Sequence, residues 1–106
     1  MISVTDYLLL SAILLNENRS HGKEIFESAE KLAKEHKGSV SYGSMYPALD
    51  RLENEGLLKS EMDRPRQVRG GKARRLYSVT GSGQRAVRSF ESMASKVGAR
   101  IRQVMA

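Results

Sequence analysis

The sequence predicts a mainly α-helical fold of the α+β class, a winged helix-turn-helix with a two-stranded wing and a long C-terminal helix. Three observations predict it. Three segments with the apolar period of a helix come first, two short strand-like segments follow, and the helical period then returns until nearly the end of the chain. A length of 106 residues allows one small core. We expect residues 1–80 to form the winged helix and residues 81–106 to form the last helix.

The first helix is predicted from an apolar run, YLLLSAILL, at residues 7–15. Ser3 or Thr5 can cap it, and because the helix is apolar on nearly every side through Leu15, it must be buried on several sides. The run is about half the length needed to cross a bilayer, and the N-terminus lacks the positive charge of a signal peptide. Together with the absence of cysteine, these features predict a soluble, cytoplasmic protein that does not span a membrane.

The second helix is predicted to run from Lys23 to about His36, with Gly38 ending it. Its apolar residues follow the spacing of a half-buried helix. These residues are Ile25, Phe26, Ala29, Leu32 and Ala33.

The third helix, within SYGSMYPALDRLENEGLL, contains a proline near its start. Gly56 closes the helix, and either Ser41 or Ser44 caps it. If Ser44 is the cap, Pro47 lies in the first turn, where backbone N–H groups have no intrahelical acceptor, so its missing N–H costs no hydrogen bond. If the helix starts at Ser41, Pro47 lies deeper in the helix and crowds the carbonyl of Gly43. The residues predicted to face the core are Met45, Leu49 and Leu52.

The first turn of this third helix suits entry into a DNA groove. Its small residues allow close approach, and its free backbone N–H groups can meet phosphates. Tyr42 and Tyr46 can reach a phosphate or a base edge. The alternative is that either tyrosine is a core aromatic residue.

A strongly basic segment separates the two predicted strands, 57–63 and 73–79. Gly70 and Gly71 give the backbone the freedom needed at a hairpin tip. Six cations and no acid surround this tip: Arg64, Arg66, Arg69, Lys72, Arg74 and Arg75. Arginine suits phosphate because its planar group donates two parallel hydrogen bonds. The alternative is a solvated basic loop without a partner.

Charge is also divided unequally along the chain. Residues 1–63 carry 7 Lys and Arg against 11 Asp and Glu, whereas residues 64–106 carry 11 against 1. This division predicts a polyanionic partner for the second part, with double-stranded DNA as the first candidate and a membrane surface as the second.

The last helix can begin at Thr80, with Gly81 and Gly83 weakening its first turn. Its apolar residues recur at alternating spacings of three and four, which is a heptad seam. The seam comprises Val87, Phe90, Ala94, Val97, Ile101 and Val104, and Met93 widens it. A stripe of this width predicts a homodimer. The alternatives are a helix that folds back on its own domain and a helix that lies on a membrane surface.

Catalytic and metal sites are not predicted. His21 is expected at a helix start and His36 at the surface, and neither has a second ligand at metal-binding spacing. The glycine-rich segments do not match a phosphate-binding loop, and no nucleophile has a partner base. We therefore expect no enzyme and no cofactor.

Four blocks of the sequence resemble the PadR family of bacterial transcriptional regulators. They are LLLSAIL, SHGKEIFE, SYGSMYPALDRLENEGLL and ARRLYSVTGSGQRAV, which follow the family's order and extend over about residues 7–90. The resemblance implies a winged helix that binds a palindromic operator, usually as a repressor. It also implies a homodimer formed through the last helix, part of which packs on the first helix, around Leu8, of the partner chain.

The resemblance also assigns roles to residues of this chain. Lys23 begins the supporting helix near the DNA backbone, and the basic hairpin of residues 64–75 is the wing. The DNA-facing residues at the start of the third helix are Ser41, Tyr42, Gly43, Ser44, Tyr46 and Pro47.

Three departures from the family pattern bear on these roles. Lys23 replaces the usual Tyr, and Ser44-Met45 replaces Thr-Leu, which leaves the operator sequence open. The segment TGSG replaces Thr-Glu-Ala-Gly, which predicts a looser junction before the last helix.

Two other functions stay open. One is a sensor whose dimer crevice binds a small apolar or aromatic effector and then releases DNA; Phe90, as the sole aromatic residue of the last helix, disfavours aromatic stacking there. The other is a protein-interaction module with an incidental basic wing.

Overall fold

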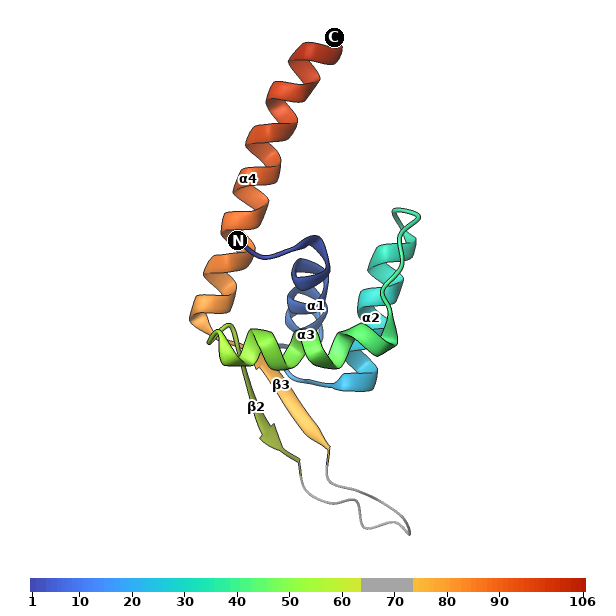
Figure 1. The fold of residues 1–106 in the computed structure, drawn as a ribbon, viewed down its shortest axis with the longest axis vertical. Coiled ribbons are helices and arrows are strands. Elements are labelled where there is room, and N and C mark those ends of the chain that lie inside the picture. Colours follow the sequence, from blue (N-terminus) through green and yellow to red (C-terminus); the bar gives the residue numbers. More distant parts are fainter. Residues whose placement is uncertain (64–73) are drawn as a thin grey trace.

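The computed structural model of the chain describes residues 1–63 and 74–106, and it has the predicted mainly α-helical winged-helix fold (Figure 1). Its elements, in chain order, are α1 (Val4–Leu15), β1 (Ser20–His21), α2 (Gly22–Lys34), α3 (Tyr42–Asn54), β2 (Leu58–Met62), β3 (Arg75–Val79) and α4 (Gly81–Met105).

A small antiparallel sheet with the strand order β1-β3-β2 joins the helices at one end of the molecule. β2 and β3 pair in register from Leu58 opposite Val79 to Met62 opposite Arg75. The sequence did not predict β1, because two residues are too few to show a strand pattern. β1 pairs Ser20 with Tyr77 and therefore fixes the start of α2 to the central strand.

α1 lies at the centre of the helical layer, and the prediction that it is buried on several sides is confirmed. Its residues Leu9, Leu10, Ala12 and Ile13 have no exposed surface. The apolar face of α3 packs into the same core, with Met45, Leu49 and Leu52 also fully buried. α3 lies across the molecule above β2 and β3 (Figure 1). Its apolar side packs into the core, whereas the residues on its other side are exposed.

The helix starts decide between the predicted alternatives. Ser3 caps α1, because its hydroxyl accepts a hydrogen bond from the Asp6 N–H at 3.0 Å while the Asp6 carboxylate accepts from the Ser3 N–H at 3.2 Å. α3 begins directly after Ser41. Pro47 is therefore inside the helix, where its ring faces the carbonyl of Gly43 one turn earlier.

The helix ends follow the prediction in one case and correct it in another. Gly56 ends α3 with a φ of +80°, as predicted, in the left-handed region that glycine adopts without strain. After α2, however, the left-handed residue is Lys37, with a φ of 57°, and not Gly38. The N–H of Gly38 instead donates to the carbonyl of Ala33 at 2.8 Å, which closes the turn.

The junction between β3 and α4 is tighter than the sequence predicted. Thr80 caps α4 by accepting from the Gly83 N–H at 3.0 Å, and its hydroxyl donates to the Gly56 carbonyl at 2.6 Å. A Cβ atom on Gly83 would overlap the carbonyl oxygen of Leu57. Gly83 therefore does not loosen the junction but permits the close approach of α4 to the turn after α3.

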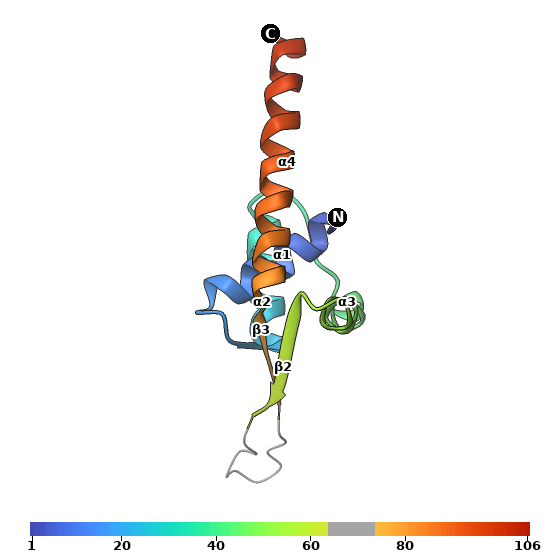
Figure 2. The same cartoon turned by 90° about the vertical axis from the view of Figure 1, so that its left-hand side faces the viewer.

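The long helix α4 projects from the rest of the molecule (Figures 1 and 2). The Cα radius of gyration is 15.8 Å, compared with about 13 Å expected for a compact domain of about 100 residues. Val87 near its start is buried, whereas Val97, Ile101 and Val104 are 49%, 48% and 82% exposed. The distal part of α4 therefore does not fold back on its own domain. Within the described ranges, no helix is both long enough and apolar enough to cross a membrane.

Candidate nucleic-acid interface

The start of α3 presents the predicted DNA-facing residues on the surface. All six are exposed, including Tyr42 at 50% and Tyr46 at 40%, so neither tyrosine is a core residue. Met45, which lies between them in sequence, is fully buried and anchors this turn to the core. The hydroxyl of Ser44 donates to the carbonyl of Ser41 at 3.1 Å and orders the first turn.

An aromatic cluster connects α3 to α2. The ring of Tyr42 lies edge-on to those of Phe26 and Tyr46, with centroids 5.1 and 5.7 Å apart. Tyr46 also lies over the backbone of Gly22 so closely that a Cβ atom there would overlap the tyrosine hydroxyl. Its hydrogen bond with Tyr42, together with partial burial, raises the pKa of Tyr46 to about 12. Like any tyrosine, Tyr46 is protonated at neutral pH, and its hydroxyl can donate a hydrogen bond.

His21 holds the start of α2, as the sequence predicted for a helix-start residue. Its backbone N–H and its ring Nδ1 both lie within hydrogen-bond distance of the Glu24 carboxylate, at 3.0 and 2.7 Å. Its Nε2 lies 3.0 Å from the Asp63 carboxylate directly after β2. The His21 backbone N–H is the main cause that lowers the pKa of Glu24. His21 thus fastens the start of α2 to the end of β2.

A cavity of about 200 Å³, here called the wing-base cavity, forms where α2, α3 and β3 meet. Its lining residues are His21, Gly22, Lys23, Tyr46, Arg74, Arg75 and Tyr77. Four of these come from the predicted DNA-binding set, and they derive from three separate segments of the chain. The wing-base cavity therefore brings the cationic side chains of Lys23, Arg74 and Arg75 together with Tyr46 of α3. The other predicted wing residues lie outside the described residues: Arg64, Arg66, Arg69, Gly70, Gly71 and Lys72.

Sequence reasoning missed an ion pair that positions α3. The guanidinium of Arg51 contacts the Asp6 carboxylate at 2.5 Å and that of Glu55 at 3.2 Å. Asp6 is only 3% exposed and also caps α1, so Arg51 ties α3 to the first turn of α1. The sequence did not indicate this pair, because Asp6 and Arg51 are 45 residues apart along the chain.

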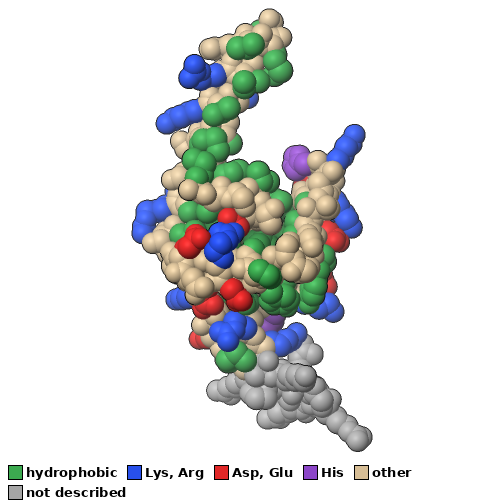
Figure 3. All heavy atoms as spheres, viewed as in Figure 1, with side chains coloured by type: hydrophobic (Ala, Val, Ile, Leu, Met, Phe, Trp, Pro, Cys, Tyr) green, Lys and Arg blue, Asp and Glu red, His purple; other side chains and the backbone are tan. Residues whose placement is uncertain are grey.

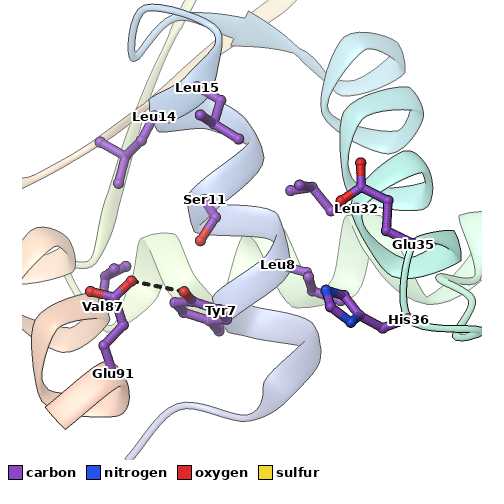
Figure 4. A pocket seen from close by; sticks show the side chains of 10 residues that line it. All are labelled: Tyr7, Leu8, Ser11, Leu14, Leu15, Leu32, Glu35, His36, Val87 and Glu91. Atoms are coloured by element: carbon purple, nitrogen blue, oxygen red, sulfur yellow. Dashed lines mark hydrogen bonds between the residues drawn. The ribbon is translucent and has the colours of Figure 1, made fainter. Parts of the chain in front are cut away.

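Next to Asp6, the first turn of α1 also holds α4. The ring of Tyr7 stacks on Phe90 with centroids 4.6 Å apart, and its hydroxyl donates to Glu91 at 2.8 Å (Figure 4). This hydrogen bond is the main cause that raises the pKa of Tyr7. At least one face of the Phe90 ring therefore packs against its own chain.

A groove of about 430 Å³ opens beside this contact, between α1, α2 and the start of α4. Its floor is largely apolar, formed by Leu8, Leu14, Leu15 and Leu32, and Glu35, His36 and Glu91 lie at its edge (Figure 4). Of the predicted dimer residues, Leu8, Phe90 and Met93 are half-buried and Val87 is buried, whereas Ala94, Val97, Ile101 and Val104 are exposed. Hydrophobic side chains continue along α4 beyond the body of the molecule (Figure 3).

Metal binding has no support in the part of the chain that the structure describes, since no group of three or more His, Asp or Glu side chains there is placed to hold an ion.

Comparison with known proteins gives consistent matches. The model of the transcriptional regulator PadR-like family matches residues 9–89. The transcriptional regulator Rv3488 of Mycobacterium tuberculosis is 36% identical over 85 residues, which span 76% of this chain and 72% of that protein.

Solved structures match as well. The crystal structure of a PadR family transcription regulator from Clostridium difficile R20291 has a TM-score of 0.75 and 26% identity, with 98% of this chain and all of that chain covered. Bacillus subtilis PadR in complex with operator DNA has a TM-score of 0.67 and 22% identity, over 85% of this chain and 48% of that chain. This last similarity is one of fold.

Proposed function

Since this chain belongs to the PadR-like family of transcriptional regulators, we propose that it is a homodimeric repressor that binds an inverted-repeat operator in double-stranded DNA. It acts in the cytoplasm, without catalytic activity, cofactor or membrane contact.

The observation that carries the DNA-binding part is the convergence at the wing-base cavity. Lys23, Arg74 and Arg75 supply positive charge beside the exposed start of α3. The major groove of B-DNA, about 12 Å wide, admits an α-helix. With the start of α3 in that groove, the three cations lie next to the phosphates that border it, and contacts to phosphates set the orientation of the protein on the duplex.

The homodimer is supported by two surfaces of one chain that complement each other. The distal part of α4 exposes an apolar stripe of Val97, Ile101 and Val104, and burial of each side chain contributes about 1.5–3 kcal/mol when complete. The groove beside α1 offers an apolar floor on which this stripe can pack.

The charges at the two surfaces are also complementary. Arg100 lies beside Val97 and Val104 of the stripe on α4, whereas Glu35 and Glu91 line the groove. This arrangement favours a second copy of the chain over an unrelated apolar partner.

Two-fold symmetry then determines the form of the operator. The strands and the C-terminus of α4 lie at opposite ends of the molecule, so a dimer joined through α4 keeps both DNA-facing ends free (Figure 1). Its half-sites are expected to be inverted and about 10 bp, or a multiple of that, apart.

The direct test is selection of binding sites from a random duplex library by the purified protein at near-physiological salt. Enrichment of an inverted repeat is the expected result. Measurable binding without an enriched sequence would contradict sequence-specific recognition and favour a nonspecific or protein-binding role. Placing the selected site over a promoter in a reporter assay should lower expression when the protein is present.

The groove also favours a second candidate function, a sensor of a small apolar effector. Its volume of about 430 Å³ lies within the range of small-molecule pockets, and its lining offers Ser11, Glu35 and His36 as polar contacts. An effector would compete there with the partner's helix. A screen for ligands that shift the melting temperature, followed by a test of whether each hit releases DNA, separates this function from simple repression.

A further inference from the structure

We propose that Asp50 is a specificity-determining residue that reads the amino group of a cytosine in each operator half-site. The sequence analysis assigned this residue no role. The proposal rests on the proposed function, because it requires α3 to occupy the major groove.

The position of Asp50 on α3 places it on the DNA-facing side. The core side of this helix consists of Met45, Leu49 and Leu52, all fully buried. Asp50 is exposed and follows Tyr46 by four residues, so the two side chains are neighbours on one face of the helix. Asp50 therefore continues the surface that begins with Gly43 and Tyr46.

Contacts of neighbouring residues show which side of α3 this is. Tyr46, one turn before Asp50, reaches the wing-base cavity, and Glu53, almost one turn after it, accepts a hydrogen bond from Ser60 of β2 at 2.5 Å. The pKa of Tyr77 on β3 is raised mainly by burial and, as the next largest cause, by the negative charge of Asp50. Asp50 thus lies on the side of α3 that faces the sheet and the base of the wing, where the DNA is expected.

Within the described residues, Asp50 also differs from the other acids of α3 and its C-cap in having no hydrogen-bond or ion-pair partner. Glu53 is bonded to Ser60, and Glu55 is paired with Arg51 at 3.2 Å. In the ranges that the structure describes, Asp50 makes neither a hydrogen bond nor an ion pair. Its carboxylate is therefore free to accept hydrogen bonds from a ligand.

The chemistry of base edges selects cytosine. A carboxylate is an acceptor only, so it is repelled by phosphates and by the acceptors that guanine and thymine expose in the major groove. Cytosine presents an N4 amino donor there, whereas the N6 amino donor of adenine stands beside the N7 acceptor. A carboxylate at this place both attracts cytosine and excludes the alternatives, which is how specificity is built.

The test is binding-site selection with the wild-type chain and with Asp50→Asn and Asp50→Ala. The wild type should require cytosine at one position of each half-site, with about 5- to 150-fold preference. Asp50→Ala should lose the preference at that position alone. Asp50→Asn should change it from cytosine to adenine, because an amide can bond N6 and N7 together.

Glu55→Gln provides the matched control, since it removes the same charge from the C-cap of α3 on the side of Arg51. It should raise affinity for all duplexes slightly and leave the selected sequence unchanged. An unchanged motif in both Asp50 variants overturns the inference while the proposed function stands. A wild-type chain that selects no motif overturns both. Equal far-UV spectra and melting temperatures of the variants show that folding is not the cause.

Discussion

At the scale of single residues, Tyr46 and Arg74 occupy the same cavity but are expected to act differently on DNA. Tyr46→Ala removes the ring and hydroxyl from the surface of α3 that is proposed to face the bases, so the difference in binding free energy between operator and random duplex should fall by about 1–2 kcal/mol. Arg74→Ala removes a cation that is proposed to neutralise a phosphate. It should weaken binding to both duplexes alike and reduce the slope of log K against log salt by about 1. Titrations of both duplexes over a salt series measure these quantities, and equal effects on specificity would refute the distinction.

Arg51 is expected to contribute to stability although it is half-exposed. Arg51→Met leaves the carboxylate of Asp6 buried without its cationic partner, which should lower the free energy of unfolding by about 1–3 kcal/mol. Denaturant titration measures it as a lower midpoint at a constant slope. Glu55→Gln removes the other, solvent-exposed partner of Arg51, and it should change stability by less than about 0.5 kcal/mol. An equally large decrease in this control would mean that the pairing with Asp6 is not the cause.

At the scale of elements, two glycines in the same turn of α4 should respond oppositely to the same substitution. In Gly83→Ala the new methyl group meets the Leu57 carbonyl, which is backbone and cannot rotate away, so stability should fall by about 1–3 kcal/mol. In Gly81→Ala the nearest neighbouring atom is the end of the Arg85 side chain at 3.6 Å, so the better helix propensity of alanine should raise stability by about 0.5–1 kcal/mol. Thermal melts of the two variants compare them directly, and similar shifts would contradict the tight junction described above.

The elements also show where sequence reasoning succeeds and where it fails. Helices with a strong apolar period were predicted within two residues of their ends, because burial of one face determines both pattern and structure. β1 was missed, and Lys37 rather than Gly38 adopts the left-handed conformation, because both depend on local backbone geometry that has no periodic signal. The convergence of Lys23, Tyr46 and Arg74 depends on tertiary packing, and spacing along the chain carries no information about it.

At the scale of the whole molecule, the exposed stripe on α4 should decide the oligomeric state. Ile101→Asp places a charge in the centre of the stripe, and it should convert the dimer to a folded monomer, because the residue makes little contact with its own domain. Sedimentation velocity over a concentration series measures the change. Ala99→Asp adds the same charge on the opposite side of α4 and should leave the dimer intact. A monomeric wild type, or a dimeric Ile101→Asp, would show that α4 does not hold the subunits together.

The two adjacent residues Asp6 and Tyr7 have a consequence for how the molecule moves. One holds α3 through Arg51 and the other holds α4 through Phe90 and Glu91, and both belong to a single capped turn of α1. The helix proposed to read DNA and the helix proposed to join the subunits are thus attached to the same capped turn of α1. In the proposed dimer, a tilt of α4 would be transmitted through this turn to α3, and the distance between the two α3 helices would follow the angle between the subunits.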